Sequence, residues 1–291
     1  MTSGPAFSRI LAVHTGQQVD RELLEYSALL ASSESEASTL VAAFPGESIL
    51  GSLAPAARAI FAARGAQAPA MRLFTEPELD CVFEAAVEYN ADLILARRPE
   101  NGRQGRAIGR RLVSEAPCSV CLVPPNVALK IDRAIAGVDL SPKGQALLAS
   151  AARFCGQTGA EELIALHSCF RETLIGDDQI AESFLDRRLV DLHRLLPRAA
   201  LAKLDCTPAV EQSVTHDRAL LRAVCAHEAD VLVVGRWGLL PASLAYPSRE
   251  LENLLWHCPV PLLQVLLSKH RIPFFQALGA RLFANPEPVF N

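Results

Sequence analysis

The sequence contains few aromatic residues, little methionine and a modest amount of charge. Of its 291 residues, 6% are aromatic, 21% are charged and 50% are hydrophobic, with two methionines and two tryptophans. Because aromatic side chains are scarce, alanine, leucine, valine and isoleucine must build the core. That composition favours helices packed on sheets over an aromatic-rich all-β fold. The high hydrophobic fraction also excludes a chain that is disordered throughout.

An excess of positive charge, long apolar runs and a disulfide pattern are missing too. The 28 lysines and arginines are outnumbered by 32 acidic residues, for a net charge of −4, which argues against a general nucleic-acid-binding protein. There is no run of about 18 apolar residues, so no transmembrane helix is expected. The first residues lack the basic and apolar parts of a secretory signal. The eight cysteines are scattered, so we expect reduced thiols in a cytoplasmic protein.

The two halves of the chain repeat one pattern. In each half an apolar run comes first, a second run follows a helical segment, and a third has a proline near its start. These runs lack polar alternation, which is typical of strands buried on both faces of a parallel sheet. The matched runs are 9–14 with 134–139, 91–98 with 229–236, and 116–123 with 258–265.

This repeat predicts two α/β domains. Each half alternates about five strands with helices, which implies two repeated parallel sheets with helices on both faces, a Rossmann-like arrangement. We assign residues 1–129 to the first domain, 130–267 to the second and 268–291 to a tail, with a proline-led connector at 124–129. Apolar residues at helical spacing predict an added helix over 180–196 in the longer second half. In such sheets ligands bind beyond the carboxyl ends of the strands.

Spaced glycines follow the fourth strand of the second half. Gly235 and Gly238 are followed, after nine further residues, by Ser248 and Arg249, and Val138-Asp139 ends the first strand of this half. Together these features resemble tandem universal stress proteins, whose motif is Gly-x-x-Gly, nine residues, then Gly and Ser or Thr. The resemblance spans residues 8–124 and 132–266. It implies an adenine nucleotide alpha hydrolase-like fold and a non-enzymatic, regulatory role in the stress response.

The resemblance also implies roles for these residues. Asp139 is expected near the adenosine part of ATP, or of a related adenine nucleotide, and no metal site is evident. Gly235 and Gly238 would let backbone amides approach the phosphates, since no Cβ intervenes. Ser248, which replaces the third glycine, can cap a helix whose N-terminus faces the phosphates. Arg249, which replaces the hydroxyl residue, would supply positive charge.

The first half departs further from the motif. Ala96-Arg-Arg-Pro99 stands where Gly-x-x-Gly belongs, and proline lacks a donor N–H. His14 stands in place of the aspartate at the end of the first strand. We therefore predict that the first domain has lost ordinary ATP binding.

Arginines are concentrated after the fourth strand of the first half, with a single acid, Glu100, among them. One interpretation is a site for a nucleotide phosphate or another phosphorylated ligand. The alternative is a solvated loop and helix face, which is usual for charge runs. A nucleic acid is disfavoured because no aromatic residues interleave. The arginines are Arg97, Arg98, Arg103, Arg106, Arg110 and Arg111.

Three further features each allow more than one interpretation. Cys118-x-x-Cys121 has the spacing of a metal or redox site, but residues three apart on a strand face opposite sides, which favours packing thiols. His216-Asp217 is either a catalytic pair or the start of a helix capped by Asp217. The amphipathic tail after Pro273 is either a docking segment, a membrane-surface helix or a segment folded over its own domain.

Two functions of different classes follow. The first is a stress-response protein that binds an adenine nucleotide in its second domain. The second is a nucleotide-independent interaction scaffold, in which both pockets are degenerate and the domains pair through their last strands. In either case we expect an intrachain pseudo-dimer, with a homodimer of whole chains as a further alternative. An adenine-nucleotide hydrolase ranks last, because no Ser-Gly-Gly pyrophosphatase loop is visible.

Overall fold

The computed structural model describes residues 6–16, 18–32, 37–44, 47–74, 79–100, 102–170, 178–196, 204–236 and 249–268. The first domain contains β1 (Arg9–Thr15), α1 (Arg21–Ser32), β2 (Ser38–Phe44), α2 (Glu47–Ala63), β3 (Ala70–Leu73), α3 (Leu79–Glu88), β4 (Leu93–Arg97), α4 (Arg103–Glu115) and β5 (Ser119–Val123). The second contains β6 (Arg133–Gly137), α5 (Pro142–Thr158), β7 (Glu162–Phe170), α6 (Asp178–Leu195), β8 (Asp205–Ser213), α7 (His216–Ala226), β9 (Val231–Arg236), α8 (Arg249–His257) and β10 (Leu262–Leu266).

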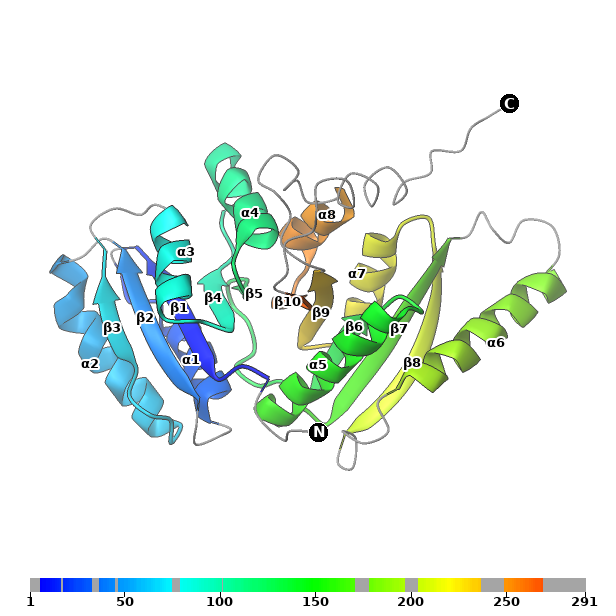
Figure 1. Cartoon of the computed structure of the whole chain (residues 1–291), viewed down its shortest axis with the longest axis horizontal. Helices are drawn as coiled ribbons and strands as arrows, with labels where there is room; N and C mark the ends of the chain where they lie inside the picture. Colours follow the sequence, from blue (N-terminus) through cyan, green and yellow to red (C-terminus); the bar gives the residue numbers. More distant parts are fainter. Residues whose placement is uncertain are drawn as a thin grey trace.

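The described strands form one continuous sheet, in the order β3-β2-β1-β4-β5-β10-β9-β6-β7-β8. Neighbouring strands are parallel within each domain, whereas β5 and β10 pair antiparallel between the domains, with Leu122 opposite Leu262. Figure 1 shows this pair between the two halves. The predicted repeated α/β fold is therefore confirmed, and pairing through the last strands makes the chain a pseudo-dimer. The predicted helix over 180–196 is α6.

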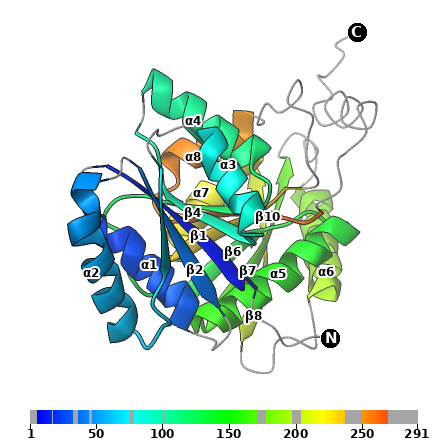
Figure 2. The ribbon, with the colours of Figure 1, turned by 60° about the vertical axis from the view of Figure 1, so that its left-hand side comes forward.

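Helices cover both faces of the sheet (Figure 2). Alternate residues of each strand point to opposite faces, so Ile10 packs in the cluster with α1 and α5, while the adjacent Leu11 packs with α3 and α4. α2 and α6 lie on the α1 side, and α7 and α8 on the other. Burial on both faces explains why the central strands are largely apolar, unlike the edge strands β3 and β8.

Two arginines at matched positions, Arg98 and Arg236, reach across the domain boundary in opposite directions. The buried Arg236, at the end of β9, donates to the carbonyls of Val113 at 3.2 Å, Ala116 at 2.6 Å and Cys118 at 3.0 Å, at the C-terminal end of α4. Arg98, after β4, donates to the carbonyl of Cys258 after α8. Helix C-termini carry unpaired carbonyls that favour positive charge. Burial lowers the pKa of Arg236 to about 10, so it stays charged at neutral pH.

A buried glutamine joins the domains on the opposite face. Gln157, on α5, accepts the Phe7 N–H at 2.9 Å and donates to the carbonyls of Phe7 at 2.8 Å and Leu30 at 2.9 Å. The rings of Phe7 and Phe154 meet edge to face beside it, with centroids 6.3 Å apart. Contacts on both faces of the sheet therefore set how the two domains sit together.

The cysteines that drew attention in the sequence pack in the core. Cys118 and Cys121 are buried free thiols in different apolar clusters, on opposite faces of the sheet, as packing thiols on a strand would be. Within the described ranges, no group of three or more His, Cys, Asp or Glu side chains could hold a metal ion. None of the helices described is both long and apolar enough to span a bilayer.

Candidate functional site

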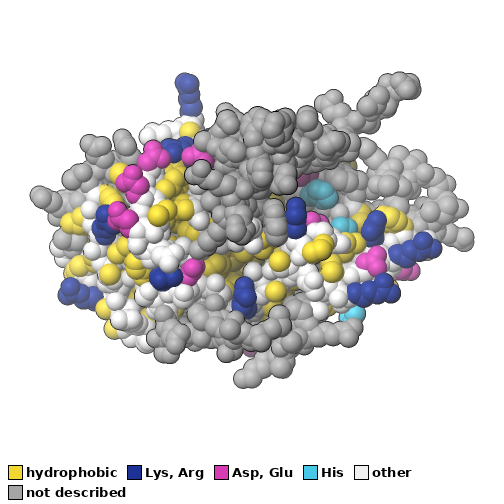
Figure 3. All heavy atoms as spheres, viewed as in Figure 1, with side chains coloured by type: hydrophobic (Ala, Val, Ile, Leu, Met, Phe, Trp, Pro, Cys, Tyr) yellow, Lys and Arg dark blue, Asp and Glu magenta, His cyan; other side chains and the backbone are white. Residues whose placement is uncertain are grey.

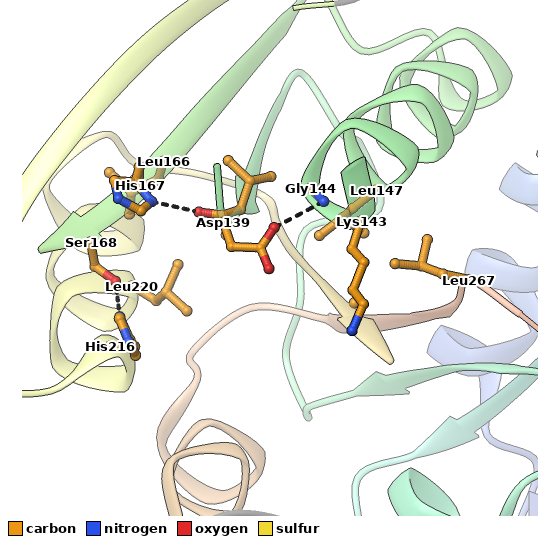
Figure 4. Close-up of a pocket in the computed structure, with 13 residues that line it drawn as sticks. Asp139, Lys143, Gly144, Leu147, Leu166, His167, Ser168, His216, Leu220 and Leu267 are labelled. Carbon is orange, nitrogen blue, oxygen red and sulfur yellow. Dashed lines mark hydrogen bonds between the residues drawn. The ribbon is translucent and has the colours of Figure 1, made fainter. Parts of the chain in front are cut away.

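One cavity lies where the sequence places a ligand, beyond the carboxyl ends of β6, β7 and β9. Its volume is about 270 Å³, just below the usual range for small-molecule sites, which is about 300–1,000 Å³. It is lined by predicted residues Asp139 and Gly235 and by apolar side chains such as Leu147, Leu220 and Leu267. Figure 4 shows these walls with the polar side chains among them. We call it the domain 2 pocket.

Asp139 shapes the pocket by holding the start of α5. Its Oδ1 accepts the Gly144 N–H at 3.0 Å and the Ser141 hydroxyl at 2.6 Å, and the Ser141 oxygen accepts the Lys143 N–H at 3.1 Å. These contacts satisfy N–H groups that a helix start leaves unpaired. A Cβ at position 144 would lie 1.9 Å from the Asp139 carbonyl oxygen, so only glycine permits this approach. The Asp139 residue remains exposed at the pocket edge.

Gly235 keeps the pocket open at the end of β9. A Cβ there would lie 3.1 Å from Leu267 and 3.4 Å from Leu147. Contacts of that length are tight but fall on the ends of flexible side chains. A longer side chain would have to extend past them toward the pocket that all three residues line.

Three polar side chains of the pocket were not among the residues predicted to bind the nucleotide. His167 lies beside the carbonyl of Val138, its Nδ1 at 3.0 Å, and the Ser168 hydroxyl contacts Nδ1 of His216 (Figure 4). Their positions at the end of β7 and the start of α7, both on the carboxyl side of the sheet, were the available signal. Burial lowers the pKa of His167, as do the charges of Arg188 and His216.

The matching place in the first domain is occupied by an arginine. The backbone N–H of Asp92 donates to the carbonyl of Arg9, and the N–H of Asp230 donates to that of Arg133. These equivalent bonds give the residue correspondence between the two domains. In that correspondence Arg97 is equivalent to Gly235. The Arg97 guanidinium pairs with Asp20 and with Glu22, at 3.1 Å for Glu22, and donates to the Pro124 carbonyl at 2.8 Å.

The ion pair is partly buried. Burial alone would raise the pKa of Asp20, but the hydrogen bond and charge of Arg97 outweigh it and lower that pKa. The arginine therefore lies over the start of α1, where the second domain has its open pocket over the start of α5.

His14 takes the helix-capping role of Asp139, although the strands align one residue differently. In the residue correspondence between the two domains, Thr15 and not His14 is equivalent to Asp139. Even so, His14 Nε2 accepts the Asp20 N–H at 2.9 Å, and Asp20 corresponds to Gly144, whose N–H Asp139 accepts. Because Nε2 accepts a hydrogen bond, the buried His14 is neutral.

We expect the protein to lose stability below about pH 6.5, the ordinary histidine pKa. Burial lowers the pKa of His14 despite the charge of Asp20, and it lowers that of His167 as well. Below that pH the unfolded chain therefore binds more protons at these two histidines than the folded chain does. This contribution is fully present above the unfolded pKa and is lost as the pH falls through the folded values.

Urea unfolding between about pH 7.5 and 5.5 measures this effect. His14→Asn should flatten the dependence, whereas substitution of the exposed His193 should leave it as steep as in the wild type. Equal slopes in wild type and His14→Asn would contradict the assignment.

The arginines of the first half separate into several environments. Arg97 and Arg98 are engaged as described, Arg110 Nη2 donates to Glu252 at 3.1 Å, and Arg111 pairs with Asp80 and Glu115. Arg103 is exposed. Arg106 lines a second cavity, which is also where Arg249 lies; neither lines the domain 2 pocket. Gly238, Ser248 and the tail after position 268 lie outside the described residues.

No protein-family model matches the chain, and no curated protein matches it. Solved structures do. A functionally unknown protein, PA1789, from Pseudomonas aeruginosa is 15% identical, with 90% of this chain and 93% of that chain covered and a TM-score of 0.65. A universal stress protein from Archaeoglobus fulgidus is 14% identical, with 89% and 98% covered and a TM-score of 0.57.

A third solved structure is the cytoplasmic domain of a prokaryotic cation chloride cotransporter. It is 16% identical, with 94% of this chain and 98% of that chain covered and a TM-score of 0.56. At these identities the likeness concerns the fold. The resemblance to tandem universal stress proteins is confirmed at that level: the chain has their two-domain α/β fold.

Proposed function

We propose that this protein is a cytoplasmic, stress-response regulatory module that binds an adenine nucleotide in its second domain and none in its first. One contrast carries the proposal: Asp139 and Gly235 line an open cavity, whereas Arg97, at the position of Gly235, is ion-paired over the matching place in the first domain. The likeness in fold to a universal stress protein supports the same function.

The pocket residues fit the nucleoside part of such a ligand. Leu147, Leu220 and Leu267 offer apolar walls for a base, and burying a planar ring against them is favourable. Asp139 uses Oδ1 for the helix start, and its exposed position leaves the carboxylate able to accept ribose hydroxyls. The phosphates would be held by the segment from Gly238 to Ser248, as the family motif implies.

ATP should raise the thermal stability of the full chain. A ligand at a hundred times its Kd that binds only the folded state stabilises it by about 2.7 kcal/mol, a shift of several degrees in Tm. Differential scanning calorimetry with ATP, AMP and adenosine measures the shift. Tripolyphosphate is the control for phosphate contacts without the nucleoside. No shift with any adenine compound at millimolar concentration would contradict the proposal.

A nucleotide-independent interaction scaffold is the second candidate. Two observations favour it: the occupied site in the first domain, and the likeness in fold to the cytoplasmic domain of a cotransporter. Protein purified without added nucleotide, then denatured and analysed by absorbance and chromatography, separates the two. One bound adenine nucleotide per chain excludes the scaffold. The proposal assigns no catalysis, so phosphate release from ATP should stay at background with or without divalent metal.

A further inference from the structure

A second cavity lies between α4, α7 and α8. Its volume is about 480 Å³, and it shares no lining residue with the domain 2 pocket. Both domains contribute to it: Arg106 comes from α4, Arg218 from the first turn of α7 and Arg249 from the start of α8, with Trp256 on the same wall. We call it the α4–α7–α8 cavity.

The carboxylates of this cavity are already engaged by the protein. They are Glu252, which accepts from Arg110 at 3.1 Å, Glu250, which accepts the His216 N–H at 3.3 Å, and Asp217, which accepts from Asn253. Arg218 and Arg249, by contrast, form no hydrogen bond or ion pair with any residue in the described ranges. Glu250 and Asp217 accept from neutral donors and so keep their negative charge, whereas Glu252 is ion-paired with Arg110. Counting Arg110, four arginines meet three carboxylates at this cavity, a net charge of 4 − 3 = +1.

The sequence that precedes Arg249 supplies no further acid. The segment 237–248 reads WGLLPASLAYPS and contains no charged residue. Arg218 and Arg249 line the same cavity and have no ion-pair partner in the described ranges, so they repel each other, and a bound anion would relieve that repulsion. Guanidinium groups suit oxyanions because they donate two parallel hydrogen bonds.

The shape of the cavity depends on a close contact between the domains. A Cβ at Gly109 on α4 would lie 2.9 Å from Leu255 and 3.0 Å from the Trp256 ring, so this glycine lets α4 approach α8. Two buried polar atoms on the cavity wall, Thr215 Oγ1 and Asp217 Oδ1, have no hydrogen-bond partner. Buried polar groups are rarely left unpaired. The Thr215 hydroxyl can donate to a bound oxyanion, whereas the Asp217 carboxylate oxygen only accepts hydrogen bonds and does not contribute to holding an anion.

We propose that the α4–α7–α8 cavity binds a small phosphate monoester between the two domains. Arg218 and Arg249 from the second domain hold the phosphate oxygens, and Arg106 adds charge from the first domain. A phosphate offers more oxygens than a carboxylate and so matches several guanidinium groups. This site is independent of the adenine nucleotide pocket, and its ligand contacts helices of both domains.

Equilibrium dialysis of the full chain against inorganic phosphate and glycerol phosphate, at fixed ionic strength, tests the proposal. We expect saturable binding of one phosphate per chain. Arg218→Gln/Arg249→Gln should weaken it at least tenfold. The control, Arg58→Gln/Arg103→Gln, removes the same charge from exposed positions that do not line the cavity, and it should change affinity less than twofold.

Three results would overturn this assignment. They are the absence of saturable binding, an equal loss in both double variants, and the disappearance of binding in Gly235→Arg. The last variant obstructs only the domain 2 pocket, so it should retain phosphate binding. It also separates the two proposals, because adenine nucleotide binding fails in it and phosphate binding does not.

Discussion

Replacing Arg236 with methionine is expected to lower the free energy of unfolding by about 3–5 kcal/mol. The substitution removes the charged donor from the carbonyls of Val113, Ala116 and Cys118, all in buried surroundings. Methionine fills much of the space but offers no donor, so these carbonyls lose a partner that water replaces poorly. Urea unfolding followed by circular dichroism measures the change as a lower midpoint.

The same substitution at two other arginines gives the comparison for this loss of stability. Arg98 makes the reciprocal contact with one carbonyl, that of Cys258, and is half-buried, so Arg98→Met should cost about 1–2 kcal/mol. The exposed Arg153 should change stability by less than about 0.5 kcal/mol when replaced by methionine. An Arg236→Met variant as stable as Arg153→Met would show that the exchange of arginines does not hold the domains together.

In the Arg218→Gln/Arg249→Gln background, in which the α4–α7–α8 cavity no longer takes phosphates, Gly235→Arg is expected to abolish the rise in Tm that adenine nucleotides give. The new side chain would stand where Arg97 stands in the first domain and would extend into the domain 2 pocket. Thermal melts with and without ATP measure the loss. Gly235→Ala should bind more weakly than wild type yet remain folded, because its Cβ meets only the flexible ends of Leu267 and Leu147.

The matched control for this variant is Gly156→Arg. Gly156 lies on the exposed side of α5, and a Cβ there meets nothing within 4 Å. It adds the same charge and volume away from the pocket, so the ATP-dependent shift should remain. A Gly235→Arg protein that keeps the full shift would place the nucleotide elsewhere.

The fold could be predicted from the sequence because its signals are local and repeated. The apolar runs at 93–96 and 231–235 imply strands buried on both faces, and the recurrence of such runs in order implies two copies of one domain. The motif comparison placed Ala96 at the position of Gly235, whereas the strand register places Arg97 there. The pairing of Arg97 with Asp20 and Glu22 was not visible, because those acids lie far away in the sequence.

The arginine-rich segment shows why the sites were harder to predict. A run of like charges in the sequence predicts one shared charged surface. Long side chains, however, can reach different partners that the tertiary structure places nearby. Arg98 donates to the carbonyl of Cys258 after α8, and Arg110 donates to Glu252. Arg106 lines the cavity that Arg249 also lines. The partners of Arg98 and Arg110 belong to the second domain, so only the pairing of β5 with β10 brings them near these arginines.

Counting the nucleotides bound per chain tests the central claim, that two copies of one fold keep a single open pocket. The measurement is a calorimetric titration with ATP on the Arg218→Gln/Arg249→Gln variant, in which the α4–α7–α8 cavity no longer competes for phosphates. The account predicts one ATP per chain, and none when Gly235→Arg is added. Two sites would mean that Arg97 does not close the first domain, and no site would mean that Asp139 and Gly235 do not form a nucleotide pocket.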